Sequence, residues 1–313
     1  MRLTLKPWQR RTGYAVFAVL SFLYAFHATF PAGAVAERLA AEAAAAGWKL
    51  NAADSEPSGL AGVRMTGVTL QRGAGARFGV DSLSARLRFL PLVLGRRGVD
   101  FDARLFDGTI RGAAEVSGGR RHLDAEVAGV DLARAPALRE AIGIALAGNV
   151  RGDVDLTLDA RDPAKSSGHI DLSVNDAAIQ AGQLPLPGMA AGLTVPRVRL
   201  GTLTAHAEVK DGRAVFQRLE AKGGDLEMTG QDFYFALQPR LEQAPLYGRA
   251  RLAVQPAFWS QPAGAKLKPI AEVALASARA PDGSYGLQVY GTLGKPQVRL
   301  APPGAPGATT SAQ

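Results

Sequence analysis

The chain has 313 residues, with 36 Lys and Arg against 28 Asp and Glu, and a formal net charge of +8. It contains no cysteine, which excludes a disulfide framework, thiol catalysis and thiolate metal sites. Its Lys and Arg are scattered, without interleaved aromatic residues, and this argues against nucleic acid as a partner. Abundant Gly and Pro, with few aromatic residues, favour short strands and turns over helical bundles.

An almost unbroken apolar run, residues 13–30, follows a basic N-terminal flank that ends in Arg10 and Arg11. As a helix this run would be roughly 27 Å long, close to the hydrocarbon thickness of a bilayer. We therefore predict a cytoplasmic N-terminus at 1–12 and a single transmembrane helix at 13–30, with the bulk of the chain on the other side of the membrane. A cleaved signal peptide stays open as the alternative, because Ala34-Val35-Ala36 has the small-x-small form of a cleavage site.

A short helix is expected at 31–47, directly after the apolar run. The segment is rich in alanine and stops at Gly47, a residue favoured just past a helix end. Val35 and Leu39 lie one turn apart, which suits a helix that rests on the bilayer surface or covers the end of a sheet. A plain alanine-rich spacer is the remaining interpretation.

Residues 48–300 show the alternation of apolar and polar side chains that is typical of half-buried strands. Short turns such as Asp107-Gly108, Asp211-Gly212 and Asp282-Gly283 separate these runs. We therefore predict a mainly β protein with a long, curled antiparallel sheet, shaped as a trough or packed as a sandwich. A helical break near 131–147 divides this region into two candidate halves, residues 181–192 are expected to form a loop, and 301–313 to be a disordered tail.

The apolar face of the predicted sheet is the candidate functional surface. Two neighbouring strands show it most clearly, and their apolar residues are Val154, Leu156, Leu158, Ile170, Leu172 and Val174. A trough lined by these side chains would hold acyl chains, whereas a sandwich would bury the same side chains as its core. The sequence leaves both arrangements open.

The sequence carries no recognisable catalytic or metal-binding constellation. The segment Asp282-Gly283-Ser284-Tyr285-Gly286 resembles a nucleophile elbow but has Asp at the first glycine position, so a hairpin turn is the simpler interpretation. His122 and His169 each precede an Asp by two residues, yet two candidate ligands do not make a site. We therefore expect no enzyme activity, no cofactor and no metal.

The layout of the chain resembles the type II secretion system protein N family, with the AsmA-like proteins as looser relatives. The residues that carry this resemblance are strand and glycine patterns: Phe30-Pro31, Ala36-Glu37-Arg38-Leu39, Leu90-Pro91-Leu92, Gly108-Thr109-Ile110-Arg111-Gly112, Asp131-Leu132, Pro136-Ala137-Leu138, Gly148-Asn149-Val150-Arg151-Gly152 and Gly291-Thr292-Leu293-Gly294-Lys295-Pro296. They span nearly the whole chain, although each motif alone has a low information content.

The resemblance implies a single-pass protein of the bacterial inner membrane with its bulk in the periplasm. The function that it implies is that of a non-enzymatic accessory component of type II protein secretion, with other secretion-system components and the membrane as partners. Its looser relatives imply the alternative, a periplasmic lipid-binding or lipid-transfer protein that holds phospholipid in an apolar groove. No catalytic residue is carried over in either case.

Overall fold

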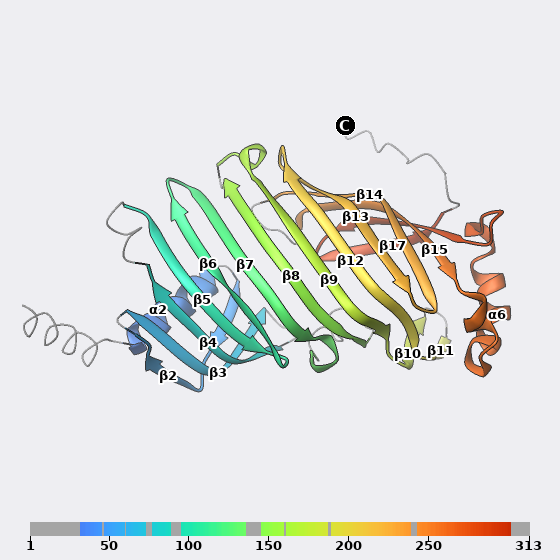
Figure 1. The fold of residues 1–313 in the computed structure, drawn as a ribbon, viewed down its shortest axis with the longest axis horizontal. Helices are drawn as coiled ribbons and strands as arrows, with labels where there is room; N and C mark the ends of the chain where they lie inside the picture. Colours follow the sequence, from blue (N-terminus) through green and yellow to red (C-terminus); the bar gives the residue numbers. More distant parts are fainter. Residues whose placement is uncertain are drawn as a thin grey trace, which may run out of the picture. The chain divides into compact units, whose positions relative to one another are not determined.

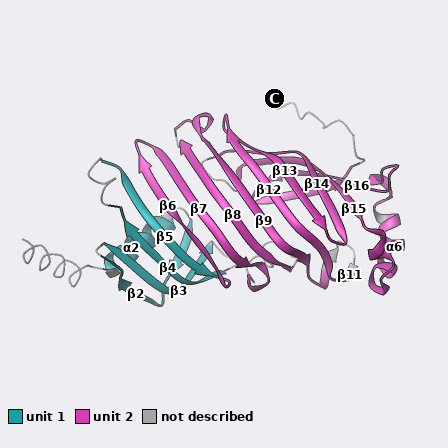
Figure 2. Cartoon of the chain, in the orientation of Figure 1, with its two compact units in different colours: residues 1–105 teal, residues 106–313 magenta. Residues whose placement is uncertain are grey.

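The computed structural model describes residues 32–45, 47–59, 61–72, 77–88, 95–135, 145–159, 161–186, 189–238 and 243–301. Fifteen strands form one antiparallel sheet that is not closed, and two further strands form a separate hairpin (Figure 1). This architecture confirms the prediction of a mainly β chain built on a long antiparallel sheet. The chain divides into two compact units, residues 1–105 and 106–313 (Figure 2).

Several predicted segments lie outside the described residues. They include the cytoplasmic N-terminus at 1–12 with Arg10 and Arg11, the transmembrane helix at 13–30 and nearly all of the tail at 301–313. Within the part of the chain that the structure describes, no helix combines the length and the apolar character needed to cross a bilayer.

The described part of unit 1 consists of one helix and five strands. These elements are α2 (Ala32–Ala45), β1 (Trp48–Asn51), β2 (Asp54–Pro57), β3 (Gly62–Arg72), β4 (Arg77–Leu87) and β5 (Arg97–Leu105). The two short strands β1 and β2 pair with different parts of β3, and β4 pairs with both β3 and β5. The strands β3, β4 and β5 thus form the central part of the sheet in this unit.

The core of unit 1 is centred on β3, where Val63, Met65 and Val68 are almost completely buried. Val35 and Leu39 of α2 pack against this cluster, so the helix covers the sheet of its own unit. Gly47 follows the helix with a φ of 83°, a left-handed conformation that glycine adopts without a Cβ clash. The alanine-rich segment is therefore a packed element of unit 1.

Unit 2 contains the remaining strands and short helices. The strands are β6 (Gly108–Ser117), β7 (Arg120–Asp131), β8 (Leu146–Asp159), β9 (Ser167–Ile179), β10 (Gly182–Leu186), β11 (Met189–Val195), β12 (Val198–Lys210), β13 (Arg213–Gly223), β14 (Leu226–Ala236), β15 (Pro245–Val254), β16 (Tyr285–Thr292) and β17 (Lys295–Leu300). The α-helices are α5 (Pro256–Trp259) and α6 (Pro262–Ala274). Strands pair in chain order except that β9 pairs directly with β12, because β10 and β11 pair with each other (Figure 1).

Two segments of unit 2 were predicted to interrupt the strands, residues 181–192 as a loop and residues 131–147 as a helical break. Residues 181–192, which we expected to form a loop, contain β10 and most of β11, so this prediction was wrong. A two-stranded hairpin has two free edges and tolerates Pro185, which hid the strand in the sequence pattern. In the predicted break at 131–147, Leu132–Arg134 form a 3₁₀ turn that the side chain of Asp131 caps, and residues 136–144 lie outside the described residues.

Candidate functional site

The six candidate lining residues lie on one face of β8 and β9. Residues that face each other across an antiparallel pair project to the same side of the sheet, and Val154 opposes Ile170 while Val150 opposes Val174. Alternation along each strand adds Leu156, Leu158 and Leu172 to this side. The predicted apolar face is therefore continuous across the two strands.

All six of these side chains are half-buried, and none is fully enclosed. Leu156 and Leu158 touch a small cluster formed by Val209, Ala214 and Leu237. The fully buried apolar residues of unit 2 are mostly alanines, and Leu237 is the sole Leu or Ile among the buried residues that the structure describes. The large aliphatic side chains of this face are thus only partly enclosed.

The opposite face of the same strands carries carboxylates at directly opposing positions. Asp124 faces Asp155, and Glu126 faces Asp153 across β7 and β8. Asp153 in turn faces Asp171 across β8 and β9. Like charges at directly opposing positions destabilise a sheet, so this arrangement needs compensation.

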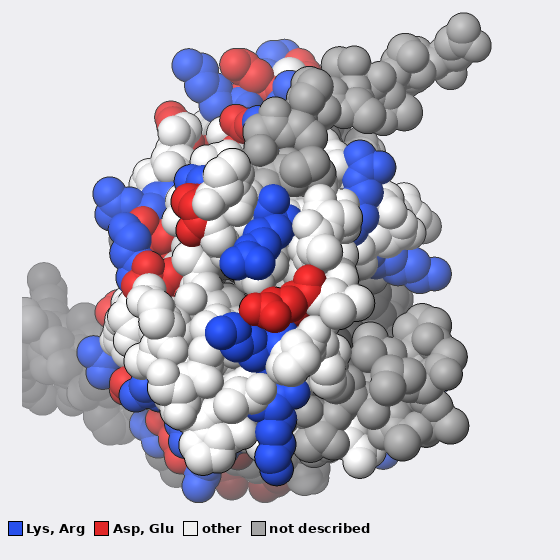
Figure 3. Space-filling view, turned by 90° about the vertical axis from the view of Figure 1, so that its right-hand side faces the viewer, with Lys and Arg blue, Asp and Glu red and all other residues white. Residues whose placement is uncertain are grey.

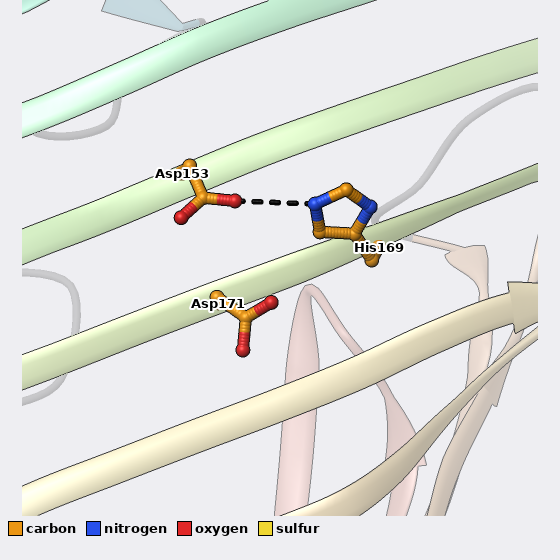
Figure 4. Close-up of side chains that lie close together, drawn as sticks. All are labelled: Asp153, His169 and Asp171. Carbon is orange, nitrogen blue, oxygen red and sulfur yellow. Dashed lines mark hydrogen bonds and ion pairs between the residues drawn. The ribbon is translucent and has the colours of Figure 1, made fainter.

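Histidines contact three of these carboxylates, Asp153, Asp155 and Asp171. His169 Nε2 lies 3.2 Å from Asp153 Oδ2 (Figure 4), and His206 Nδ1 contacts Asp171 Oδ1. His122 Nδ1 is bonded to Thr157 Oγ1 at 3.1 Å and lies 3.8 Å from Asp155 Oδ1. Among the described residues, Asp153, Asp155 and Asp171 thus each have a histidine nitrogen within 4 Å of a carboxylate oxygen.

The sequence showed only part of this cluster of carboxylates and histidines on the polar face. The His169-x-Asp171 spacing was visible, but Asp153 lies on another strand and joins the two residues through the register of β8 and β9. His206 arrives in the same way, opposite Asp171, from β12. The signal that could have found the cluster is the recurrence of acidic and histidine residues at the polar positions of consecutive strands.

Ser284 is part of a turn. Its hydroxyl donates to Asp282 Oδ1 at 2.6 Å and accepts a hydrogen bond from Arg251 Nε at 2.8 Å. Gly283 has a φ of 82°, and its N–H donates to the carbonyl of Ala280, which closes the turn. These contacts support the hairpin interpretation of the segment over a nucleophile elbow, because no histidine among the described residues bonds to the hydroxyl.

Charged side chains elsewhere are mixed in sign. On the face shown in Figure 3, Lys and Arg lie among Asp and Glu and uncharged residues, without a patch of one sign among the described residues. Unit 1 contains a hollow of about 380 Å³ on the polar side of β3–β5. Its charged lining consists of Arg64, Arg86, Asp100, Asp102 and Arg104, so cations and anions are again interspersed.

Comparisons with protein-family models, curated proteins and solved structures returned no match. Membership of the type II secretion system protein N family therefore remains a proposal.

Proposed function

We propose that this chain is a non-enzymatic, membrane-anchored protein of the bacterial envelope whose unit 2 binds the acyl chains of phospholipid on the apolar face of its sheet. The observation that carries the proposal is the incomplete burial of the large aliphatic side chains on β8 and β9. In this proposal the sheet curls as a trough, the more open of the two arrangements that the sequence left undecided. A transmembrane helix at 13–30, which the sequence predicts, would anchor the chain at a supply of lipid.

Burial of apolar area favours this occupant. Each methylene group that leaves water contributes about 0.8 kcal/mol, so an acyl chain that lies along Leu156, Leu172 and their neighbours gains binding energy without specific polar contacts. The side chains of this face are only partly buried, and in this proposal the membrane places acyl chains beside them as an apolar partner.

Native mass spectrometry of the full chain, purified from membranes in mild detergent, tests the proposal. We expect phospholipid to remain bound in a fixed stoichiometry. Leu172→Glu should remove this lipid, because it places a charge on the apolar face. Ser173→Glu, one residue further on the opposite face, is the matched control and should retain it. A lipid-free wild-type mass would overturn the proposal.

The second candidate is a component of type II secretion, and an exposed edge strand favours it alongside the resemblance of the sequence. β17 pairs only with β16 among the described strands, and every residue of β17 is exposed. Val298 is 61% exposed on this strand. An edge with free backbone groups can accept a strand from a partner protein.

A photo-crosslinking amino acid at position 298 in the intact cell separates this candidate from lipid binding alone. We expect crosslinks to another component of the secretion machinery. The same amino acid at Glu272, an exposed position on α6, is the control. Crosslinks from both positions, or from neither, would count against a specific partner at β17.

A further inference from the structure

We propose that Asp153, His169 and Asp171 bind a divalent transition-metal ion such as Zn²⁺ on the polar face of unit 2. This inference does not depend on lipid binding, because the three side chains project from the face opposite the apolar one. The single nitrogen or oxygen atom that each residue offers lies within 4.8 Å of those of the other two (Figure 4). Small side-chain rotations bring such a set to the bond lengths of about 2.0–2.2 Å that zinc requires.

The backbone fixes where these donors lie. Asp153 and Asp171 are register partners on β8 and β9, and His169 lies two residues from Asp171 on the same face. Strand positions hold ligands more precisely than loops do, which favours a defined coordination geometry. The side chains of His169 and Asp153 are 46% and 60% exposed, so an ion can enter from solvent.

His206 acts as a positioning residue for this site. Its Nδ1 contacts Asp171 Oδ1 from the neighbouring strand β12, where it is the direct register partner of Asp171. Outer-shell hydrogen bonds of this kind orient a carboxylate ligand, and their loss lowers metal affinity by about 10–100-fold. Three protein ligands leave the fourth tetrahedral position of zinc to water.

Charge and donor type together select the class of ion. The opposition of Asp153 to both Glu126 and Asp171 concentrates negative charge that a cation would neutralise. Ca²⁺ and Mg²⁺ prefer oxygen ligands throughout, whereas an imidazole nitrogen beside carboxylates suits zinc and its neighbours in the first transition row. The histidine is therefore what distinguishes this site from a cluster of exposed acids.

Isothermal titration of Zn²⁺ into the full chain in detergent, prepared without a histidine tag, tests the site. We expect one equivalent to bind, with an affinity that falls at least tenfold in His169→Gln and about tenfold in His206→Gln. His122→Gln is the matched control, because it also removes a histidine from the polar face of the sheet, but on β7, which β8 separates from β9. This variant should bind zinc as tightly as the wild type does.

Asp153→Asn keeps the test independent of folding. It should leave the thermal unfolding temperature of the metal-free protein unchanged or raised, since it removes a carboxylate from opposing carboxylates, and it should still abolish the stabilisation by Zn²⁺. Three results would each overturn the proposal. They are unchanged zinc affinity in His169→Gln, equal losses of zinc affinity in His169→Gln and His122→Gln, and binding of Mg²⁺ as tight as that of Zn²⁺.

Discussion

Arg199 and Asp225 hold each other through both backbone and side chain. Asp225 accepts hydrogen bonds from the backbone N–H of Arg199 at 3.0 Å and from its guanidinium Nε and Nη2 at 3.2 and 2.9 Å. The N–H of Asp225 donates in return to the carbonyl of Arg199 at 2.7 Å. These hydrogen bonds connect the start of β14 to β12 across the end of β13. The Asp225 side chain that accepts them is only 4% exposed.

Replacement of Asp225 with Ala should lower the free energy of unfolding by about 2 kcal/mol. The substitution leaves the backbone N–H of Arg199 without its acceptor, and a hydrogen bond to a charged group contributes about 1.5–3 kcal/mol to net stability. Urea unfolding of the full chain in detergent, followed by tryptophan fluorescence, measures the change. Glu272→Gln, which removes an exposed negative charge on α6, is the control. Equal effects of the two substitutions would contradict the structural role of the pair.

The same pair predicts a dependence of stability on pH. Hydrogen bonds from the Arg199 side chain hold the pKa of Asp225 below its ordinary value, against the opposing effect of burial. Its stabilisation is therefore complete above the unfolded-state pKa of about 3.9 and is lost as the pH falls through the folded-state pKa. The difference in unfolding temperature between the wild type and Asp225→Asn should shrink below about pH 4. A difference that stays constant from pH 7 to pH 3 would show that the charge of Asp225 is unimportant.

Alternation of apolar and polar residues was sufficient to predict β8 and β9 and the side of the sheet on which their apolar residues lie. Val154 to Leu158 and Ile170 to Val174 follow a period of two, and the structure places them on one side of adjacent strands. The pattern could not reveal the hairpin of β10 and β11, whose prolines and glycines are typical of a loop. Short strands that pair only with each other leave little periodic signal.

Contacts between strands could not be predicted from the spacing of residues along the chain. His206 and Asp171 are 35 residues apart and meet because β10 and β11 are set aside, which brings β9 beside β12. An alternative pairing of β9 with β10 would have separated them. The polar cluster therefore depends on register, which short-range patterns do not encode.

Truncation of two apolar side chains should distinguish a closed core from an open face. Met65 in unit 1 is completely buried, so Met65→Ala should lower the free energy of unfolding by about 2–5 kcal/mol. Leu172 is half-buried, and Leu172→Ala in lipid-free protein should lower the free energy of unfolding by about 1 kcal/mol, because the truncation removes less buried apolar area. Urea unfolding of the two variants gives the comparison. A cost for Leu172 as large as that for Met65 would show that the apolar face is closed.

Gly152 is a position where β8 and β9 approach too closely for a side chain. Its φ is 151°, and a Cβ there would lie 1.9 Å from the carbonyl oxygen of Asp171. Gly152→Ala should therefore push the two strands apart and lower the free energy of unfolding by about 2–3 kcal/mol. Urea unfolding of the full chain in detergent measures this loss.

Gly118 provides the control for this effect. It also has a positive φ, of 59°, but a Cβ at this position would meet no atom within 4 Å. Asn adopts this conformation readily, so Gly118→Asn should change the stability by less than about 0.5 kcal/mol. Similar losses in both variants would mean that backbone conformation, rather than the approach of β9, constrains these glycines. Because Gly152 opposes Leu172 and adjoins Asp153, the first substitution should also weaken lipid and zinc binding together, which Gly118→Asn should not do.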